Sequence, residues 1–339
     1  LLKGNTLTIT ASDIETRLVT SIEVNNPEGE GLFAVSAKIL LEPLKELPEQ
    51  PLKFDIDDDN LEIFIHFENG KYNFIGLKGD TYPQQKALKE EAGKITLASS
   101  ILLNGITRTL FASADDELRP VMNGVYFDMQ EDGLVFVASD GHKLVRLENK
   151  SVKSEVASAF ILPKKPANLL KSLLHKTDEL VKISFDDNNA YVQFGSYEMV
   201  CRLLEGRYPN YNSVIPLEIP NNLIIDRLSF LNALKRVSVF SSQSSSLIKI
   251  SLFENEIIVS AQDIDFSTAA EEKIVCQYTG MQFNIGFKSP FLIEMLSNIN
   301  SSDIVFKLTD SSRAGVIVPF ENEDNEELLM LLMPMMLND

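Results

Sequence analysis

The middle of the chain alternates between two periodicities of apolar residues. In 99–112 apolar residues recur three and four positions apart, which predicts a helix with one buried face. A second stripe of this kind, made of leucines, covers 166–176. Short apolar runs bounded by turn-forming residues each predict a β-strand; they are 124–129, 134–138, 181–185 and 190–194. The pattern therefore predicts an α+β domain, with two helices packed on antiparallel sheet.

This pattern occurs three times along the chain. Each copy has a strand-like run that ends in Ala-Ser-Asp or Ala-Gln-Asp, and the three aspartates are Asp13, Asp140 and Asp263. In each copy a lysine follows 25 residues later, where a helical pattern starts; these are Lys38, Lys165 and Lys288. Such constant spacing indicates duplication of a whole domain rather than a short solenoid repeat. We expect three tandem domains of about 120 residues, an ordinary domain size; they cover 1–92, 93–218 and 219–339.

The first copy is shorter than the other two. Only twelve residues precede Asp13, whereas the second copy opens with a helix and a strand before its aspartate. By comparison with the other copies, we expect about 30 residues of the native protein, a helix and a strand, to precede Leu1. The domain boundaries fall in polar stretches at 84–93 and 216–222.

Composition is that of a globular protein, with 44% hydrophobic and 24% charged residues among 339. The two cysteines, Cys201 and Cys276, are too few for a disulfide framework and indicate a reducing compartment. The longest apolar run, 328–337, is far shorter than a membrane span and is interrupted by Pro334. We predict a cytoplasmic protein.

The net charge of −18 argues at first against a nucleic-acid partner. The charge is unevenly distributed, however. The five expected helices (37–47, 97–114, 163–176, 229–243 and 288–300) carry ten basic and three acidic residues. A basic helical face on an acidic protein would accept phosphates while the remaining surface repels DNA. The alternative is that these lysines only solvate the helix surfaces.

No catalytic or metal-binding pattern stands out. His142 follows Asp140 closely, but no nucleophile motif accompanies it. The run 55–60 begins like a calcium loop, yet Asn60 stands where glycine is required. Phosphate-binding loops and dinucleotide fingerprints are missing. We therefore predict a protein with no catalytic residue, no metal site and no cofactor.

Three separate segments resemble motifs of one known family. Residues 138–144, Ala-Ser-Asp-Gly-His-Lys-Leu, are similar to the Ala-Thr-Asp-Gly-His-Arg-Leu motif of bacterial DNA sliding clamps, the β subunits of DNA polymerase III. Residues 206–211 resemble their Gly-Arg-Phe-Pro-Asp-Tyr segment, and 332–337 resemble their Val-Met-Pro-Met-Arg-Leu ending. The resemblance spans the whole chain, with three domains in the family's order.

The resemblance implies a non-catalytic processivity factor. In the family, a head-to-tail homodimer forms a six-domain ring around duplex DNA, with helices lining the hole. Its partners are the replicative polymerase subunit, the clamp loader and other replication and repair proteins that carry a clamp-binding motif. These partners dock short peptides in a hydrophobic pocket between the second and third domains. Four of the nine methionines fall in the last ten residues, and Met-rich surfaces suit varied peptide partners.

The resemblance assigns roles to individual residues. The partner pocket would comprise, on one side, Met122, Ser139, Gly141, His142, Lys143, Leu144, Pro209, Ser213 and Val214, and on the other Lys288, Phe291, Ser312, Ala314, Leu332, Met333, Pro334, Met335 and Met336. The DNA-facing residues would be Lys38, Arg119, Lys164, Lys165, Lys171, Lys235 and Arg236. The dimer interface would pair Tyr72 and Phe74 with Val239 and Phe240. Ordinary core packing is the alternative for these four apolar residues and for the Met-rich tail.

Two other functions remain open at this point. A peptide-binding scaffold of the same fold that never encircles DNA would keep the pocket and lose the ring. An enzyme would need a nucleophile, base or metal group, and the sequence offers none.

Overall fold

The structure is a computed structural model that describes residues 1–339 except 84–92, 155, 176 and 338–339. It divides into two compact units, one made of 1–94 and 182–202 and the other of 95–181 and 203–339. Two predictions fall on residues outside the described ones. They are the boundary stretch 84–93, of which only residue 93 is described, and the last residue of the helix expected at 163–176. Each unit is considered separately.

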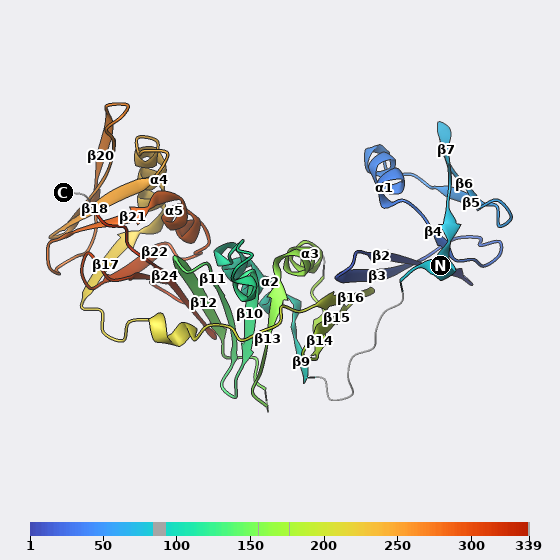
Figure 1. The fold of residues 1–339 in the computed structure, drawn as a ribbon, viewed down its shortest axis with the longest axis horizontal. Helices are drawn as coiled ribbons and strands as arrows, with labels where there is room; N and C mark the ends of the chain where they lie inside the picture. Colours follow the sequence, from blue (N-terminus) through green and yellow to red (C-terminus); the bar gives the residue numbers. More distant parts are fainter. Residues whose placement is uncertain (84–92, 155, 176, 338–339) are drawn as a thin grey trace. The chain divides into compact units, whose positions relative to one another are not determined.

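The first unit contains one helix and two main groups of strands (Figure 1). Its elements are β1 Leu2–Lys3, β2 Thr6–Ser12, β3 Thr16–Glu23, β4 Phe33–Ala34, α1 Ala37–Glu46, β5 Lys53–Ile56, β6 Glu62–Phe67, β7 Gly70–Ile75, β8 Leu77–Lys78, β15 Asn189–Phe194 and β16 Tyr197–Arg202. Strands β5, β6 and β7 form a three-stranded sheet, and β4 pairs with β8. The pairing of β3 with β16 joins the first repeat to part of the second, which is why this unit does not coincide with one repeat.

In the part that the structure describes, the second unit contains four helices and two sheets. Its elements are α2 Ser99–Thr109, β10 Gly124–Met129, β11 Leu134–Ser139, β12 Lys143–Asn149, β13 Ser158–Pro163, α3 Lys164–Leu174, β17 Asn221–Asp226, α4 Arg227–Ser238, β18 Leu247–Phe253, β19 Glu256–Asp263, β20 Thr268–Val275, β21 Asn284–Lys288, α5 Ser289–Ser297, β22 Asp303–Leu308, β23 Gly315–Pro319 and β24 Glu326–Leu332. Short 3-10 turns cover 110–112, 120–122 and 211–214. Strands β9 (Gly93–Ala98) and β14 (Leu180–Phe185) contain two of the three unit boundaries, and the third follows β16.

An eight-stranded sheet joins the second repeat to the third. Its order is β13-β10-β11-β12-β24-β23-β22-β17, and β12 pairs with β24 over seven residues. Helices α2 and α3 pack against each other and on strands β10 to β13 (Figure 1). Helices α4 and α5 form the corresponding pair in the third repeat. The five helices and antiparallel sheets confirm the predicted α+β fold.

The aspartate that marks each repeat has the same structural role three times. Asp140 follows β11, and its Oδ1 accepts the backbone N–H groups of His142 and Lys143 at 2.8 Å each. Asp13 and Asp263 hold the turns that begin at their own positions in the same way. An acidic side chain that caps its own turn stabilises a tight connection between strands. The repeated motif is therefore a signal for a tight turn after a strand.

Candidate functional site

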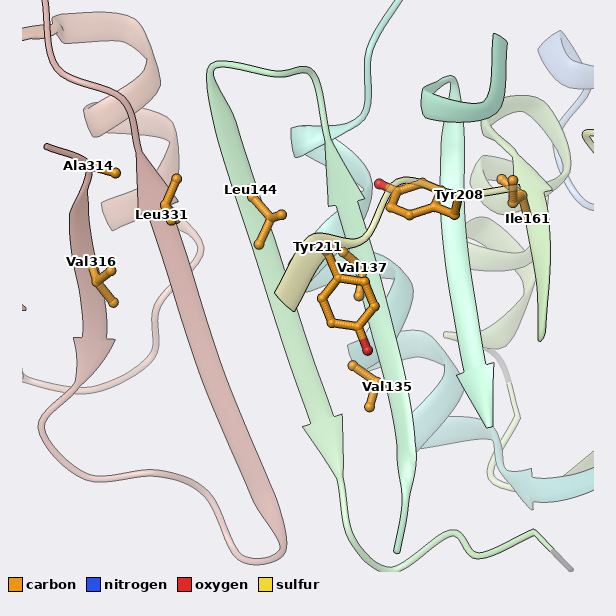
Figure 2. Packing of buried hydrophobic residues seen from close by; sticks show 9 residues of the cluster. All are labelled: Val135, Val137, Leu144, Ile161, Tyr208, Tyr211, Ala314, Val316 and Leu331. Carbon is orange, nitrogen blue, oxygen red and sulfur yellow. The ribbon is translucent and has the colours of Figure 1, made fainter. Parts of the chain in front are cut away.

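A buried apolar cluster lies where the second repeat meets the third (Figure 2). We call it the junction cluster; its members are Val135, Val137, Leu144, Ile161, Tyr208, Tyr211, Ala314, Val316 and Leu331. Leu144 on β12 stands opposite Leu331 on β24, which in turn stands opposite Val316 on β23. Because side chains alternate along a strand, these three point to one face of the sheet. Both repeats therefore supply this apolar surface.

The segment 203–220 crosses this face of the sheet and is fixed there by its tyrosines (Figure 2). The ring of Tyr208 stacks on Tyr126 with 4.6 Å between centroids. The Tyr211 hydroxyl donates to Asp128 at 2.7 Å, and burial, reinforced by that carboxylate, raises the pKa of Tyr211. The same segment leaves Pro209 and Val214 exposed beside the cluster. The buried tyrosines therefore anchor a segment whose exposed Pro209 and Val214 form an apolar rim.

The turn after β11 forms a second rim. Ser139 Oγ donates to the Lys143 carbonyl at 2.8 Å and accepts the Gly141 N–H at 3.2 Å. Gly141 has φ +90°, a conformation that favours glycine, and the Arg119 Nη1 atom lies 2.8 Å from where a Cβ would stand. The His142 side chain remains exposed. The turn is thus rigid, while its tip is open to solvent.

The Met-rich tail runs along the same region. The Met333 N–H donates to the His142 carbonyl, and the Met335 N–H donates to the Gly286 carbonyl, both at 2.8 Å. The backbone of the tail is therefore tied to both repeats, while 44% of Met333 and 91% of Met336 are exposed. An anchored backbone with exposed thioether side chains is a surface that can adapt to varied apolar partners.

The side chain of Lys143 points to the opposite face of the sheet from the junction cluster. It precedes Leu144 on β12 and is only 6% exposed, so its ammonium lies on the helix-covered face of the sheet. There it donates to Glu294 Oε2 at 2.7 Å and sits 4.5 Å from the Phe291 ring centroid. Phe291 also stacks on His142, with 6.3 Å between ring centroids.

The structure brings most of the predicted pocket residues together. Leu144 and Ala314 belong to the junction cluster, and hydrogen bonds connect Ser139, Gly141, Lys143, His142 and Met333 as described. Met122 is buried in the 3-10 turn 120–122, and Leu332 is fully buried on β24. Ser213 and Ser312 are exposed and donate within their own turns, to the Asn210 carbonyl and Asp310. Lys288 lies 5.0 Å from the Phe291 centroid, and Pro334 lies between the two anchored methionines.

Several of the predicted DNA-facing residues meet in one cavity. A hollow of about 850 Å³ lies among α2, α3 and α5, and its lining includes Arg119, Lys164 and Lys171. Lys164 pairs with Asp115 at 2.7 Å, and Arg119 pairs with Asp116 at 2.8 Å. The hydrogen bond from Arg119 lowers the pKa of Asp116.

The other predicted DNA-facing residues are not among those that line this cavity. Lys38 is exposed on α1 in the first unit, and Lys165 is exposed on α3. Lys235 is exposed on α4, whereas its neighbour Arg236 forms a two-bond ion pair with Glu272 at 2.6 and 2.8 Å. The helical cations are therefore not all equally available to phosphates.

The predicted interface residues occupy different units. In the first unit, Tyr72 and Phe74 on β7 line a groove of about 320 Å³ together with the apolar side of α1. In the second unit, Val239 and Phe240 follow α4 and are 78% and 40% exposed. The contact of these four residues in a dimer stays a prediction.

Sequence reasoning missed several contributors to the site, among them Tyr208, Tyr211 and Glu294. Tyr208 and Tyr211 lie within the 206–211 motif, so their aromatic character was a usable signal. Glu294 gave a weaker signal, because it is the single charged residue in helix α5.

The chain matches three family descriptions in succession. Residues 2–89 match the DNA polymerase III beta subunit N-terminal domain, 96–210 its central domain and 212–335 its C-terminal domain. The beta sliding clamp of Synechococcus elongatus is 29% identical over 92% of this chain and 84% of its own length. That of Treponema pallidum is also 29% identical, over 97% and 89%.

Solved structures agree with this result. The DNA polymerase sliding clamp of Pseudomonas aeruginosa superposes with a TM-score of 0.90 at 25% identity, covering 99% of this chain and 91% of that one. A sliding clamp from Bartonella birtlesii, solved with griselimycin bound, gives 0.90 at 26% identity, covering 99% and 90%. Among the described residues no helix is long and apolar enough to cross a membrane. This chain belongs to the DNA polymerase III beta subunit family, the bacterial sliding clamps, and is a three-domain, non-catalytic processivity factor of the replicative polymerase.

Proposed function

We propose that two copies of this chain close head to tail into a ring around duplex DNA, and that each copy docks short peptides of its partners at the junction cluster. The partners are the replicative polymerase subunit, the clamp loader and other replication and repair proteins with a clamp-binding motif, all in the cytoplasm. The three domains of each copy would cover 1–92, 93–218 and 219–339. The observation that carries the proposal is the junction cluster, an apolar floor with exposed residues at its rims.

The pocket has the chemistry of a peptide site. Its floor consists mostly of apolar side chains, so a peptide that lies over it desolvates few polar groups there. Exposed apolar atoms of Pro209, Val214 and Met333 stand at the rims, and covering them removes apolar surface from water. The adaptable methionines would let one site accept several related sequences.

Strand pairing supports ring closure. The first and second repeats are joined by β3 and β16, and the second and third by β12 and β24. By their order in the repeats, β20 corresponds to β12 and β7 corresponds to β24. Both are edge strands, β20 of the four-stranded sheet and β7 of the three-stranded sheet. Edge strands offer unpaired backbone groups to another chain. A second copy that pairs its β7 with β20 repeats the existing joint and closes a symmetric dimer.

The charges fit a ring that slides. Exposed helical lysines such as Lys38 and Lys235 would contact phosphates without reading sequence. Internal ion pairs such as Arg236 with Glu272 keep that attraction moderate. Weak, sequence-blind contacts combined with topological linkage are what sliding requires.

Peptide binding tests the pocket. A labelled Gln-Leu-x-Leu-Phe-type peptide is titrated by fluorescence anisotropy against the wild type and the Pro209→Ala/Met335→Ala variant. A matched control, Pro83→Ala/Met281→Ala, changes the same residue types at positions that are not among the predicted pocket residues. Saturable binding that only the first variant weakens supports the proposal. Absence of binding, or equal loss in both variants, contradicts the assignment of this pocket.

A further inference from the structure

Glu294 joins two repeats through a buried charge. It is the single charged residue of α5 in the third repeat, and its carboxylate accepts a hydrogen bond from Lys143 of β12 in the second repeat. Lys143 is 6% exposed, whereas the Glu294 side chain is 40% exposed. A buried ammonium that loses its carboxylate is strongly disfavoured, so the lysine depends on this partner more than the glutamate does.

The position of the Lys143 ammonium is set from several sides. Asp140, the second carboxylate near it, lies at 3.7 Å, a full ångström farther than Glu294. The ring centroids of Phe291 and Phe111 lie at 4.5 and 5.8 Å, within the range of a cation–π contact. Without Glu294, Asp140 becomes the nearest carboxylate for the ammonium.

Asp140 is also the residue that shapes the pocket rim. Its other oxygen holds the backbone amides of His142 and Lys143 in the turn, and the His142 carbonyl anchors the tail through Met333. A Lys143 ammonium that moves toward Asp140 pulls on the carboxylate that forms this turn. The same movement removes the cation from the Phe291 ring, on which His142 stacks.

We infer that Glu294 is a positioning residue of the partner pocket: by holding Lys143 away from Asp140, it fixes the turn 140–143, Phe291 and the tail in the geometry that receives a peptide. This inference rests on the peptide pocket proposed above. It goes beyond that proposal because Glu294 lies on the helix side of the sheet and need not touch the peptide.

The test combines peptide affinity with amide exchange. Glu294→Gln, Lys143→Met and the double variant are compared with Glu327→Gln, which breaks the exposed Lys150–Glu327 pair between the same two repeats at the other end of β24. Urea unfolding confirms that each variant is folded. Affinity is measured by anisotropy, and hydrogen exchange at the amides of His142, Lys143 and Met333 is measured without peptide.

Glu294→Gln is expected to weaken peptide binding by about tenfold and to speed exchange at the three amides by a similar factor. Residues in one hydrogen-bond network are commonly coupled strongly enough for a change of this size. The double variant should bind no more weakly than Lys143→Met alone, and Glu327→Gln should match the wild type. If Glu294→Gln keeps the exchange rates and the peptide affinity of the wild type, the inference is wrong. If the wild type binds no peptide, the pocket proposal fails, while the exchange rates still decide whether Glu294 holds the turn.

Discussion

Leu144 and Leu331 stand directly opposite each other across the antiparallel pair β12 and β24. One belongs to the second repeat and the other to the third, and both are nearly fully buried. Opposed residues in such a pair have side chains close enough to pack together. These two leucines therefore belong to the joint between two clamp domains, and in the proposal above the same side chains form the floor of the peptide pocket.

The exposed tail should contribute to binding but little to folding. Because 44% of Met333 is exposed, Met333→Ala should change the free energy of unfolding by less than about 0.5 kcal/mol, as surface substitutions usually do. The same change should weaken peptide binding by about fivefold, because the loss of the apolar contact at the rim removes about 1 kcal/mol of binding free energy. Urea unfolding and anisotropy give the two values. Met281→Ala, at a 73% exposed methionine outside the pocket, is the control and should leave affinity unchanged.

The turn at Gly141 should not tolerate a side chain. Gly141→Ala places a Cβ at φ +90° and 2.8 Å from the Arg119 guanidinium, so we expect a loss of about 1–3 kcal/mol in the free energy of unfolding. Gly29 has φ +96° but no atom within 4 Å of the point that a Cβ would occupy, so Gly29→Ala isolates the backbone strain. A smaller loss at Gly29 is predicted. Equal losses would show that the contact with Arg119 does not matter.

The two thiols should be unreactive in the folded protein. Burial raises the pKa of Cys201 to about 12 and that of Cys276 to about 11, from an ordinary value of 9.0. Because the folded state holds these protons more tightly, stability should fall as pH rises above about 9, where the unfolded thiols begin to ionise. Alkylation at pH 8 should be slow in buffer and fast in urea. Rapid alkylation of the folded chain would contradict the burial of both side chains.

Dimer formation should depend on the exposed residues after α4. Val239→Asp should convert a dimer to a monomer in sedimentation velocity, because a carboxylate would be desolvated in the interface. The folded monomer should keep its stability, since Val239 is 78% exposed. Val156→Asp makes the same change at a 71% exposed valine outside the proposed interface and should leave the dimer intact. If both variants remain dimers, Val239 is not an interface residue.

The sequence predicted local features well and side-chain directions less well. The strand 124–129 has the bounds that its apolar run indicated, because these depend on neighbouring residues. The sequence analysis used the three aspartates only as markers of the repeat, and their capping of turns is a finding of the structure. The direction of Lys143 depends on how β12 pairs with β24, a partner far away in the chain. For the same reason the sequence did not reveal that Glu294 pairs with Lys143, or that Arg236 pairs with Glu272.

Retention on DNA tests the central claim most directly. The protein is loaded onto a nicked circular plasmid with a clamp loader and separated from free protein by gel filtration at moderate salt. Half of the sample is then cut once with a restriction enzyme. A ring linked to DNA by topology should stay with the circle and be lost from the linear form by sliding off its ends. Equal retention on circular and linear DNA would contradict the ring and indicate ordinary binding to the duplex.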